Sequence, residues 1–237
     1  MSLCALWLEP VFSRDGVFYL GIVTQWHDTG SVPEIEFFNV WLPLFPFWLM
    51  KLLMDCGVSA EVASIGLNIS MRSMLPLIAF GIAERAGLDK KAAAAAALLT
   101  AVHPILTKLS IEPQRDIIYL FWAGIAAFLL LAGIRNKKWY FWAGSGIFCA
   151  FALLTRHEAF EMLLMPVIAL AVMLFVNRKD WKKHIAAGFL FYAGFLLSFS
   201  LIVQIVGLQK VQKRYCFFYG NVIKSGIKKI NSLTLKR

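Results

Sequence analysis

The sequence has few charged residues and no cysteine pair of the kind that binds a metal. Only 16% of its 237 residues are charged, 59% are hydrophobic, and the mean hydropathy is +0.68. A soluble domain does not carry so much apolar sequence, so we expect the lipid bilayer to be the solvent for most of the chain. No CxxC motif is present, and the widely spaced cysteines support neither a zinc site nor a disulfide framework. They are Cys4, Cys56, Cys149 and Cys216.

Acidic residues are missing from residues 207–237, which contain 8 basic residues. Without this segment the formal net charge of +10 falls to 16 basic against 14 acidic residues, so the basic excess belongs to the tail. A basic tail beside apolar segments favours contact with anionic lipid headgroups and gives no argument for nucleic acid. Residues 1–8 are apolar but lack the basic flank of a signal peptide. We expect them to be the remnant of a first span, and the chain to be truncated at both ends.

The apolar stretches predict an all-α, polytopic bundle of about six transmembrane helices. Residues 41–54 are apolar and aromatic but carry two prolines and a lysine, so we predict an interfacial helix that does not cross the membrane. The predicted parts are an outer loop with this interfacial helix (1–57), the bundle (58–206) and the basic tail (207–237). The predicted spans are Val58–Ala83, Ala92–Thr107, Asp116–Ile134, Trp139–Leu154, Phe160–Val176 and Ile185–Val206.

The charges of the connecting segments predict the orientation. Segments 84–91, 135–138 and 177–184 hold 10 basic and 3 acidic residues, whereas 9–41, 108–116 and 155–161 hold 4 basic and 9 acidic. Because cytoplasmic loops are rich in lysine and arginine, the first set should be cytoplasmic and the second extracytoplasmic. Trp139, Tyr140 and Trp142 then form an aromatic belt at the cytoplasmic interface.

One predicted span carries a polar stripe. Glu61, Ser64, Asn68 and Arg72 recur at spacings of three, four and four residues, so they share one helical face. A polar stripe inside a span faces the bundle interior. Hydrogen bonding between helices explains it better than catalysis does.

Three short polar segments are predicted to meet at the extracytoplasmic side. The first contains Asp15 and Tyr19, the second follows His103-Pro104 and runs from Ser110 to Asp116, and the third is Thr155–Glu158. Any one of them alone is more typical of a solvated loop. Together they place arginines at headgroup depth, where a lipid phosphate lies, and so they predict one shared site.

The order of these segments resembles the integral-membrane GT-C glycosyltransferases. It is closest to glycosyltransferase family 39, the branch of the protein O-mannosyltransferases and the lipid A aminoarabinose transferases. The resemblance rests on the sequence Asp15-Gly-Val-Phe-Tyr19, the Pro-Leu core within 41–46, His103-Pro104 before an acidic and basic turn, and a Thr-Arg-x-Glu element at 155–158. Many members of that branch carry two adjacent acids at the first motif, whereas here Asp15 is followed by Gly16.

This resemblance implies a lipid-linked sugar donor and a catalytic acid at Asp15. The carboxylate would take the proton of an acceptor hydroxyl in a one-step, inverting transfer, and arginines would stabilise the departing phosphate. It implies no cofactor. A divalent ion, if one binds, would need convergent oxygens, for which Asp15, Glu112 and Asp116 are the candidates. The candidate donor-phosphate ligands are Arg115 and Arg156, and the residues expected to bind or orient substrate are Tyr19, Glu112, Asp116, His157 and Glu158.

The expected partners are a polyprenyl-phosphate sugar donor, a lipid, glycan or protein acceptor, and membrane lipids. The expected location is a bacterial inner membrane with the active face extracytoplasmic. A multi-pass transporter and a non-catalytic membrane scaffold are the alternatives. A transporter predicts internal repeats and charges near mid-membrane, whereas this chain shows no convincing repeat and places most charges at one interface. A scaffold predicts that nothing depends on Asp15.

Overall fold

The computed structural model describes residues 12–31, 43–176 and 181–206, and in these ranges the chain is helical without strands. The predicted all-α class is therefore confirmed. The predicted remnant at 1–8 and the basic tail lie outside the described residues. The elements are α2 (Arg14–Thr29), α3 (Phe45–Asp55), α4 (Ala60–Arg85), α5 (Lys90–Val102), α6 (Pro104–Ile111), α7 (Asp116–Asn136), α8 (Trp139–Thr155), the 3-10 helix η1 (His157–Leu163), α9 (Leu164–Val176) and α10 (Trp181–Val206).

Six helical segments stand where the six spans are predicted. Four are long and apolar enough to cross a membrane alone, namely α4, α7, the run from His157 to Phe175, and α10. The pair α5 and α6 meets the same requirement only as one span bent by 46°. The apolar helix α8 has 17 residues and is about 26 Å long, a little shorter than the roughly 30 Å of a typical hydrocarbon core. Trp142 of α8 is 2% exposed, so the predicted aromatic belt is wrong for this residue, whereas Trp139 is 64% exposed and keeps the predicted interfacial character.

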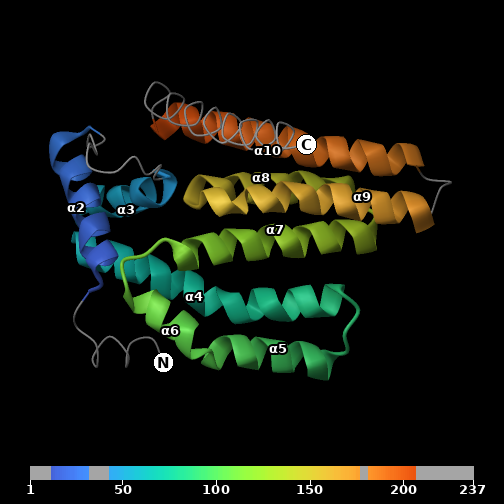
Figure 1. Ribbon diagram of the computed structural model, residues 1–237, viewed down its shortest axis with the longest axis horizontal. Helices are drawn as coiled ribbons and strands as arrows, with labels where there is room; N and C mark the ends of the chain where they lie inside the picture. Colours follow the sequence, from blue (N-terminus) through green and yellow to red (C-terminus); the bar gives the residue numbers. More distant parts are fainter. Residues whose placement is uncertain (1–11, 32–42, 177–180, 207–237) are drawn as a thin grey trace, which may run out of the picture.

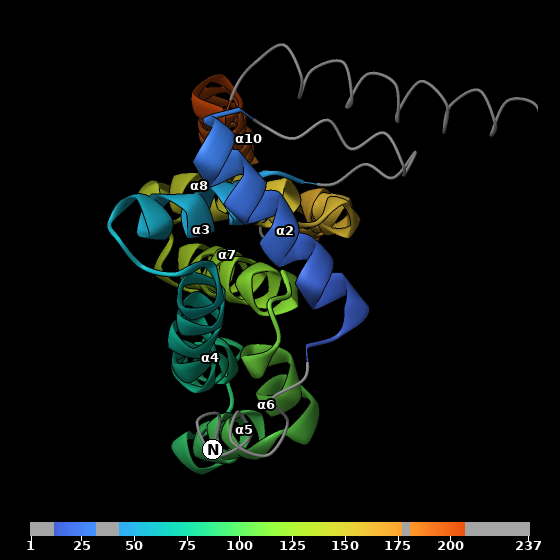
Figure 2. The same cartoon turned by 90° about the vertical axis from the view of Figure 1, so that its left-hand side faces the viewer.

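The long helices lie side by side along the long axis of the molecule, and α2 crosses one end of them (Figure 1). Seen from that end, α4, α5 and α6 lie on one side of α7, and α8 and α10 lie on the other (Figure 2). The α6–α7 turn and the α8–η1 turn reach the same end as α2. The turns α4–α5 and α7–α8 reach the opposite end.

The predicted outer loop contains a helix, α2, which corrects the sequence prediction. Ser13 caps its start by accepting a hydrogen bond from the Gly16 N–H at 3.2 Å, and Gly30 ends it in the left-handed conformation with φ 66°. The side chains of Ile22 and Trp26 are buried in the core below. The helix was missed because its exposed charged residues, such as Asp15 and Asp28, are equally typical of a solvated loop.

Helix α3 overlaps residues 41–54, for which we predicted an interfacial helix, and it is too short to span a membrane alone. Its 11 residues are about 16 Å long. It is packed more deeply than an interfacial helix, since Phe47 and Met50 are 0% and 1% exposed. At its end Asp55 accepts a hydrogen bond from Lys51 at 2.6 Å and lies 2.9 Å from Nδ1 of His27 on α2. These hydrogen bonds, from Lys51 and then from His27, hold the pKa of the Asp55 carboxyl below its usual value and join α3 to α2.

The second span is broken at Pro104, so the prediction of one continuous span is wrong. Proline has no N–H, and the carbonyl of Thr100 therefore loses its helical partner. Arg72 of α4 takes that place. Its Nη2 donates to the carbonyls of Thr100 at 2.5 Å and Ala101 at 2.9 Å. The bend is thus stabilised by a charged hydrogen-bond donor from the neighbouring helix.

The polar stripe of α4 joins helices, as the sequence analysis favoured. Three of its four residues are buried, and only Glu61 is exposed. Besides the contacts of Arg72, the Nδ2 of Asn68 donates to the carbonyls of Glu112 at 2.7 Å and Gln114 at 2.9 Å. Asn68 therefore fixes the backbone of the α6–α7 turn.

Helices α8 and α10 approach closely at glycines, as is typical of helices that associate in membranes. A Cβ built on Gly146 would overlap the backbone carbonyl of Phe191, and one on Gly194 would overlap that of Ala143. Backbone carbonyls cannot rotate away as side chains do, so a methyl group at either position must push the two helices apart.

We expect Gly146→Ala to destabilise the protein by about 1–3 kcal/mol, the usual cost of overpacking. Gly66→Ala is the matched control, because no heavy atom lies within 4 Å of a Cβ at Gly66. There the better helix propensity of alanine should leave stability unchanged or raise it by up to about 1 kcal/mol. Thermal unfolding of the purified variants in detergent measures both, and equal melting temperatures would contradict the packing described for α8 and α10.

Candidate functional site

The three predicted polar segments lie at one end of the bundle. They are the start of α2, the α6–α7 turn and the α8–η1 turn (Figure 1). The start of α2 contacts the α6–α7 turn through residues 101 positions apart in the chain. The α6–α7 turn contacts the α8–η1 turn through residues 40 positions apart.

The start of α2 docks on the α6–α7 turn. Nε2 of Gln114 donates to Oγ of Ser13 at 3.3 Å, and the same amide donates to Oε2 of Glu112 at 2.6 Å. A Cβ on Gly16 would lie 2.9 Å from Cδ of Pro113. Gly16 therefore allows the close approach that positions the first turn of α2.

Arg156 lies between two carboxylates. Its Nη1 forms an ion pair with Oδ1 of Asp116 at the start of α7. Its Nε and Nη2 donate to the two carboxylate oxygens of Glu158 at 3.2 Å and 3.1 Å. The guanidinium carbon is 5.8 Å from the ring centre of Tyr119. Asp116 and Glu158 thus orient this arginine.

Arg115 differs from Arg156 because no carboxylate among the described residues forms an ion pair with it. Its guanidinium carbon lies 5.9 Å from the ring centre of Tyr19, and its buried Nη1 has no hydrogen-bond partner within the described ranges. Burial lowers the pKa of Arg115, an effect partly opposed by the nearby side chains of Tyr19, Glu158 and Asp15. Arginine nevertheless stays charged at any physiological pH. The result is a half-buried cation with an unsatisfied donor, an arrangement that favours an anion.

Asp15 lies in the first turn of α2 with an exposed side chain. In the described part of the chain it forms no ion pair, and Arg115 is the charged neighbour that it influences electrostatically. Nδ1 of His157 lies 3.6 Å from Oε2 of Glu158. All eight predicted site residues therefore reach this end of the bundle.

Glu112 fits its predicted role less well than the other site residues, and His103 of the quoted motif lies apart from them. Glu112 accepts a hydrogen bond from Gln114 and so supports the turn, and no arginine in the described part of the chain forms an ion pair with it. His103 lies at the bend between α5 and α6. Among the described residues no three His, Cys, Asp or Glu side chains form a group that could hold a metal ion, so Asp15, Glu112 and Asp116 are not gathered as ligands.

Sequence reasoning missed Ser13, Gln114 and Tyr119. Ser13 could have been found as a serine directly before a helical segment with an acidic residue, Asp15, in its first turn, which is a capping signal. Tyr119 lies three residues after Asp116, so both face the same side of the first turn of α7. The contact of Gln114 with Ser13 joins residues 101 positions apart, and no local pattern reveals it.

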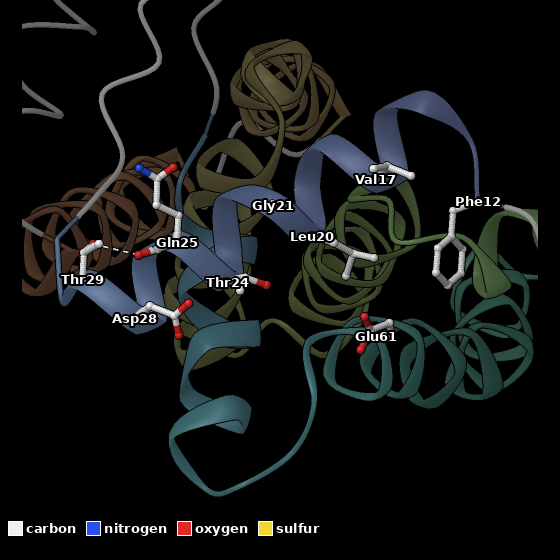
Figure 3. Close-up of a pocket in the computed structure, with 9 residues that line it drawn as sticks. All are labelled: Phe12, Val17, Leu20, Gly21, Thr24, Gln25, Asp28, Thr29 and Glu61. Carbon is white, nitrogen blue, oxygen red and sulfur yellow. Dashed lines mark hydrogen bonds between the residues drawn. The ribbon is translucent and has the colours of Figure 1, made fainter.

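A separate cleft of about 650 Å³ runs along α2 (Figure 3). The residues of α2 that line it, from Val17 through Gly21 to Asp28, recur at spacings of three and four and so lie on one helical face. Glu61 of α4 also lines the cleft. Asp15 and Tyr19 lie on the other face of α2. The cleft thus contains none of the predicted site residues.

A family model described as dolichyl-phosphate-mannose-protein mannosyltransferase matches residues 42–207. The matched part includes the α6–α7 and α8–η1 turns and begins after α2, so Asp15 and Tyr19 lie outside it. No curated protein and no solved structure matches the chain.

Proposed function

The chain belongs to the dolichyl-phosphate-mannose-protein mannosyltransferase family and is a membrane glycosyltransferase of the GT-C type; from this premise we propose that it uses a lipid-linked donor. In the proposed reaction a sugar passes from a polyprenyl phosphate to the hydroxyl of a lipid, glycan or protein acceptor. The transfer takes place at the end of the bundle where α2 lies.

Arg115 carries this proposal. A half-buried guanidinium without an ion pair among the described residues has a place for an anion that none of those residues fills. A phosphate in that place would accept hydrogen bonds from Nη1 and would stabilise the complex by charge-assisted contacts. Arg156 is already held by two carboxylates, so we assign it to positioning and to a secondary contact with the phosphate.

Asp15 is the proposed general base. As the acceptor oxygen attacks the anomeric carbon, its proton passes to the carboxylate of Asp15. The bond between the anomeric carbon and the phosphate oxygen breaks, and the phosphate leaves with the bonding electrons toward Arg115. One displacement of this kind inverts the anomeric configuration and needs no nucleophile from the protein.

The donor class can be tested directly. We expect purified protein in liposomes to consume sugars linked to polyprenyl phosphate and to release the free polyprenyl phosphate. It should leave nucleotide-linked sugars unchanged, because the site lies at the membrane surface beside apolar helices. Chromatography of radiolabelled donors measures both, and turnover of a nucleotide sugar without a lipid intermediate would overturn the proposal.

The proposed site is extracytoplasmic, since the opposite end carries the basic connecting segments. In a cysteine-free background, we expect Asp28→Cys to react with an impermeant maleimide added to intact cells and Asn136→Cys to react only after permeabilisation. Both positions are exposed, Asp28 in α2 and Asn136 as the last residue of α7, and α2 lies across the end of the bundle opposite the α7–α8 turn (Figure 1). Reaction of Asn136→Cys from outside would place the site in the cytoplasm.

A further inference from the structure

One fully buried side chain of α4 holds the turn that precedes Arg115. Asn68 is 0% exposed, and its Nδ2 donates to the carbonyls of Glu112 at 2.7 Å and Gln114 at 2.9 Å. Both carbonyls belong to the segment between α6 and α7, where backbone polar groups need partners from outside the two helices. Because one amide donates both of its N–H groups to this turn, the turn is fixed relative to α4.

The second of these carbonyls leads directly to Arg115. The Gln114 carbonyl and the Arg115 nitrogen share one planar peptide group, so the direction of that carbonyl sets the plane from which Arg115 starts. Arg115 is the residue before α7, with φ −89° and ψ −7°, and no side-chain hydrogen bond caps the helix at this residue. The position of its guanidinium therefore depends on the backbone that Asn68 holds.

Arg115 depends on such a backbone anchor more than Arg156 does. Two carboxylates orient the side chain of Arg156, whereas Arg115 has a ring contact with Tyr19 and no ion pair among the described residues. A carboxylate beside Arg115 would also orient it, but it would compete with a phosphate for the same N–H groups. A neutral amide that acts through the backbone positions the arginine and leaves its charge available.

The next residue of the polar stripe holds the other end of α6. Arg72 lies one helical turn after Asn68 and donates to the carbonyls of Thr100 and Ala101 at the bend before Pro104. Helix α6 is therefore attached to α4 at both ends, by Arg72 before it begins and by Asn68 after it ends. Support of this kind from a neighbouring element keeps a binding group within the narrow geometry that a site requires.

We propose that Asn68 is a positioning residue for the donor phosphate. In this role it does not touch the substrate, and it holds the turn so that the guanidinium of Arg115 points to the phosphate. The proposal rests on the proposed function, because it takes Arg115 as the phosphate ligand. An asparagine that only joined helices would change the stability of the protein but not the affinity of the site.

The first variant is Asn68→Leu, which keeps the approximate size of the side chain and removes both hydrogen bonds. We expect kcat/KM for the lipid-linked donor to fall by about tenfold to a hundredfold, since a displacement of about 1 Å can cost a hundredfold. KM should rise, and binding of undecaprenyl phosphate, the probe for the phosphate contact, should weaken by a similar factor. Loss of folded protein alone would lower the apparent kcat and leave KM and this affinity unchanged.

The double variant Asn68→Leu/Arg115→Gln separates positioning from an independent effect. If Asn68 acts through Arg115, kcat/KM of the double variant should equal that of Arg115→Gln within about twofold, because no arginine is left to displace. Multiplication of the two single losses would overturn the proposal.

Asn68→Ala is the second variant, for the case that leucine prevents folding. It leaves room for a water molecule that can donate to the same two carbonyls, so KM should rise by a smaller factor. An unchanged KM in a folded variant of Asn68 would overturn the positioning role.

Ser145→Ala is the matched control. Ser145 is 1% exposed, and its Oγ donates at 2.7 Å to the carbonyl of Ala126, about 15 Å along α7 from Asp116. This variant removes a buried hydrogen bond to the backbone of α7 and should lower the melting temperature without changing KM. An equal rise in KM would mean that any loosening of α7 has this effect, and it would overturn the proposal.

Hydrogen exchange separates a failure of this proposal from a failure of the proposed function. The amides of residues 112–119 should exchange faster in Asn68→Leu than in the wild-type protein and in Ser145→Ala, whether or not the protein transfers sugar. Wild-type protein that neither transfers sugar from a lipid-linked donor nor binds undecaprenyl phosphate would overturn the proposed function and, with it, the role assigned to Asn68. An active wild-type protein whose KM is unchanged in Asn68→Leu would overturn the positioning role alone.

Discussion

Asp15→Asn should reduce sugar transfer by about a hundredfold to ten-thousandfold, the usual loss when a general base is removed. The amide keeps the size of the carboxylate but cannot take the proton of the acceptor hydroxyl. Donor binding and thermal stability should change little, because Asp15 is exposed and its side chain forms no ion pair within the described residues. The measurement is the initial rate of polyprenyl phosphate release, with donor binding followed separately.

Asp28→Asn is the matched control for this prediction. It changes the same residue type on the same helix, on the face opposite Asp15, and should keep wild-type turnover. Wild-type turnover by Asp15→Asn would remove Asp15 from the mechanism and leave Asp116 or Glu112 as the candidate base. Absence of turnover in every variant and in the wild-type protein would favour the transporter or scaffold interpretation.

Arg115→Gln should lower kcat/KM for the lipid-linked donor by about tenfold to more than a hundredfold, since a hydrogen bond from a charged donor contributes about 1.5–3 kcal/mol. The phosphate is present in the ground state and carries more charge in the transition state. KM should therefore rise and kcat should fall. Folding should be preserved, because no ion pair of the described chain is lost.

Arg156→Gln provides the comparison. It leaves the carboxylates of Asp116 and Glu158 without their partner, so it should lower the melting temperature as well as activity. These carboxylate side chains are 26% and 42% exposed, and solvent screening keeps the loss of stability to about 1 kcal/mol. If Arg115→Gln instead melts earlier and binds donor normally, Arg115 is structural and the assignment of the two arginines is reversed.

The sequence predicted the all-α bundle because long apolar runs separated by charged turns have few other solutions in a bilayer. It also predicted that Asp15, Arg115 and Arg156 reach one end, since alternating spans place every second turn on the same side. The alternation of apolar spans and charged turns was sufficient for that inference. The family match over residues 42–207 supports the resemblance on which the proposed roles depend.

Other features could not be predicted because they depend on contacts between distant residues. The bend at Pro104 persists because Arg72 hydrogen-bonds the freed carbonyls, and nothing near position 104 indicates such a partner. Arg156 forms ion pairs with two carboxylates and Arg115 forms none among the described residues, and this difference depends on which carboxylates lie close to each arginine. Both arginines lie beside helix ends, and the sequence does not distinguish them.

The central claim is that this chain transfers sugar in one displacement from a polyprenyl phosphate, and the configuration of the product tests it most directly. Wild-type protein in liposomes is supplied with a lipid-linked sugar of known anomeric configuration and a hydroxyl acceptor, and the product is analysed by NMR. The account predicts one released polyprenyl phosphate for each sugar transferred and an anomeric configuration opposite to that of the donor. Retention of configuration would contradict it, because retention requires a nucleophile that the proposed mechanism does not contain.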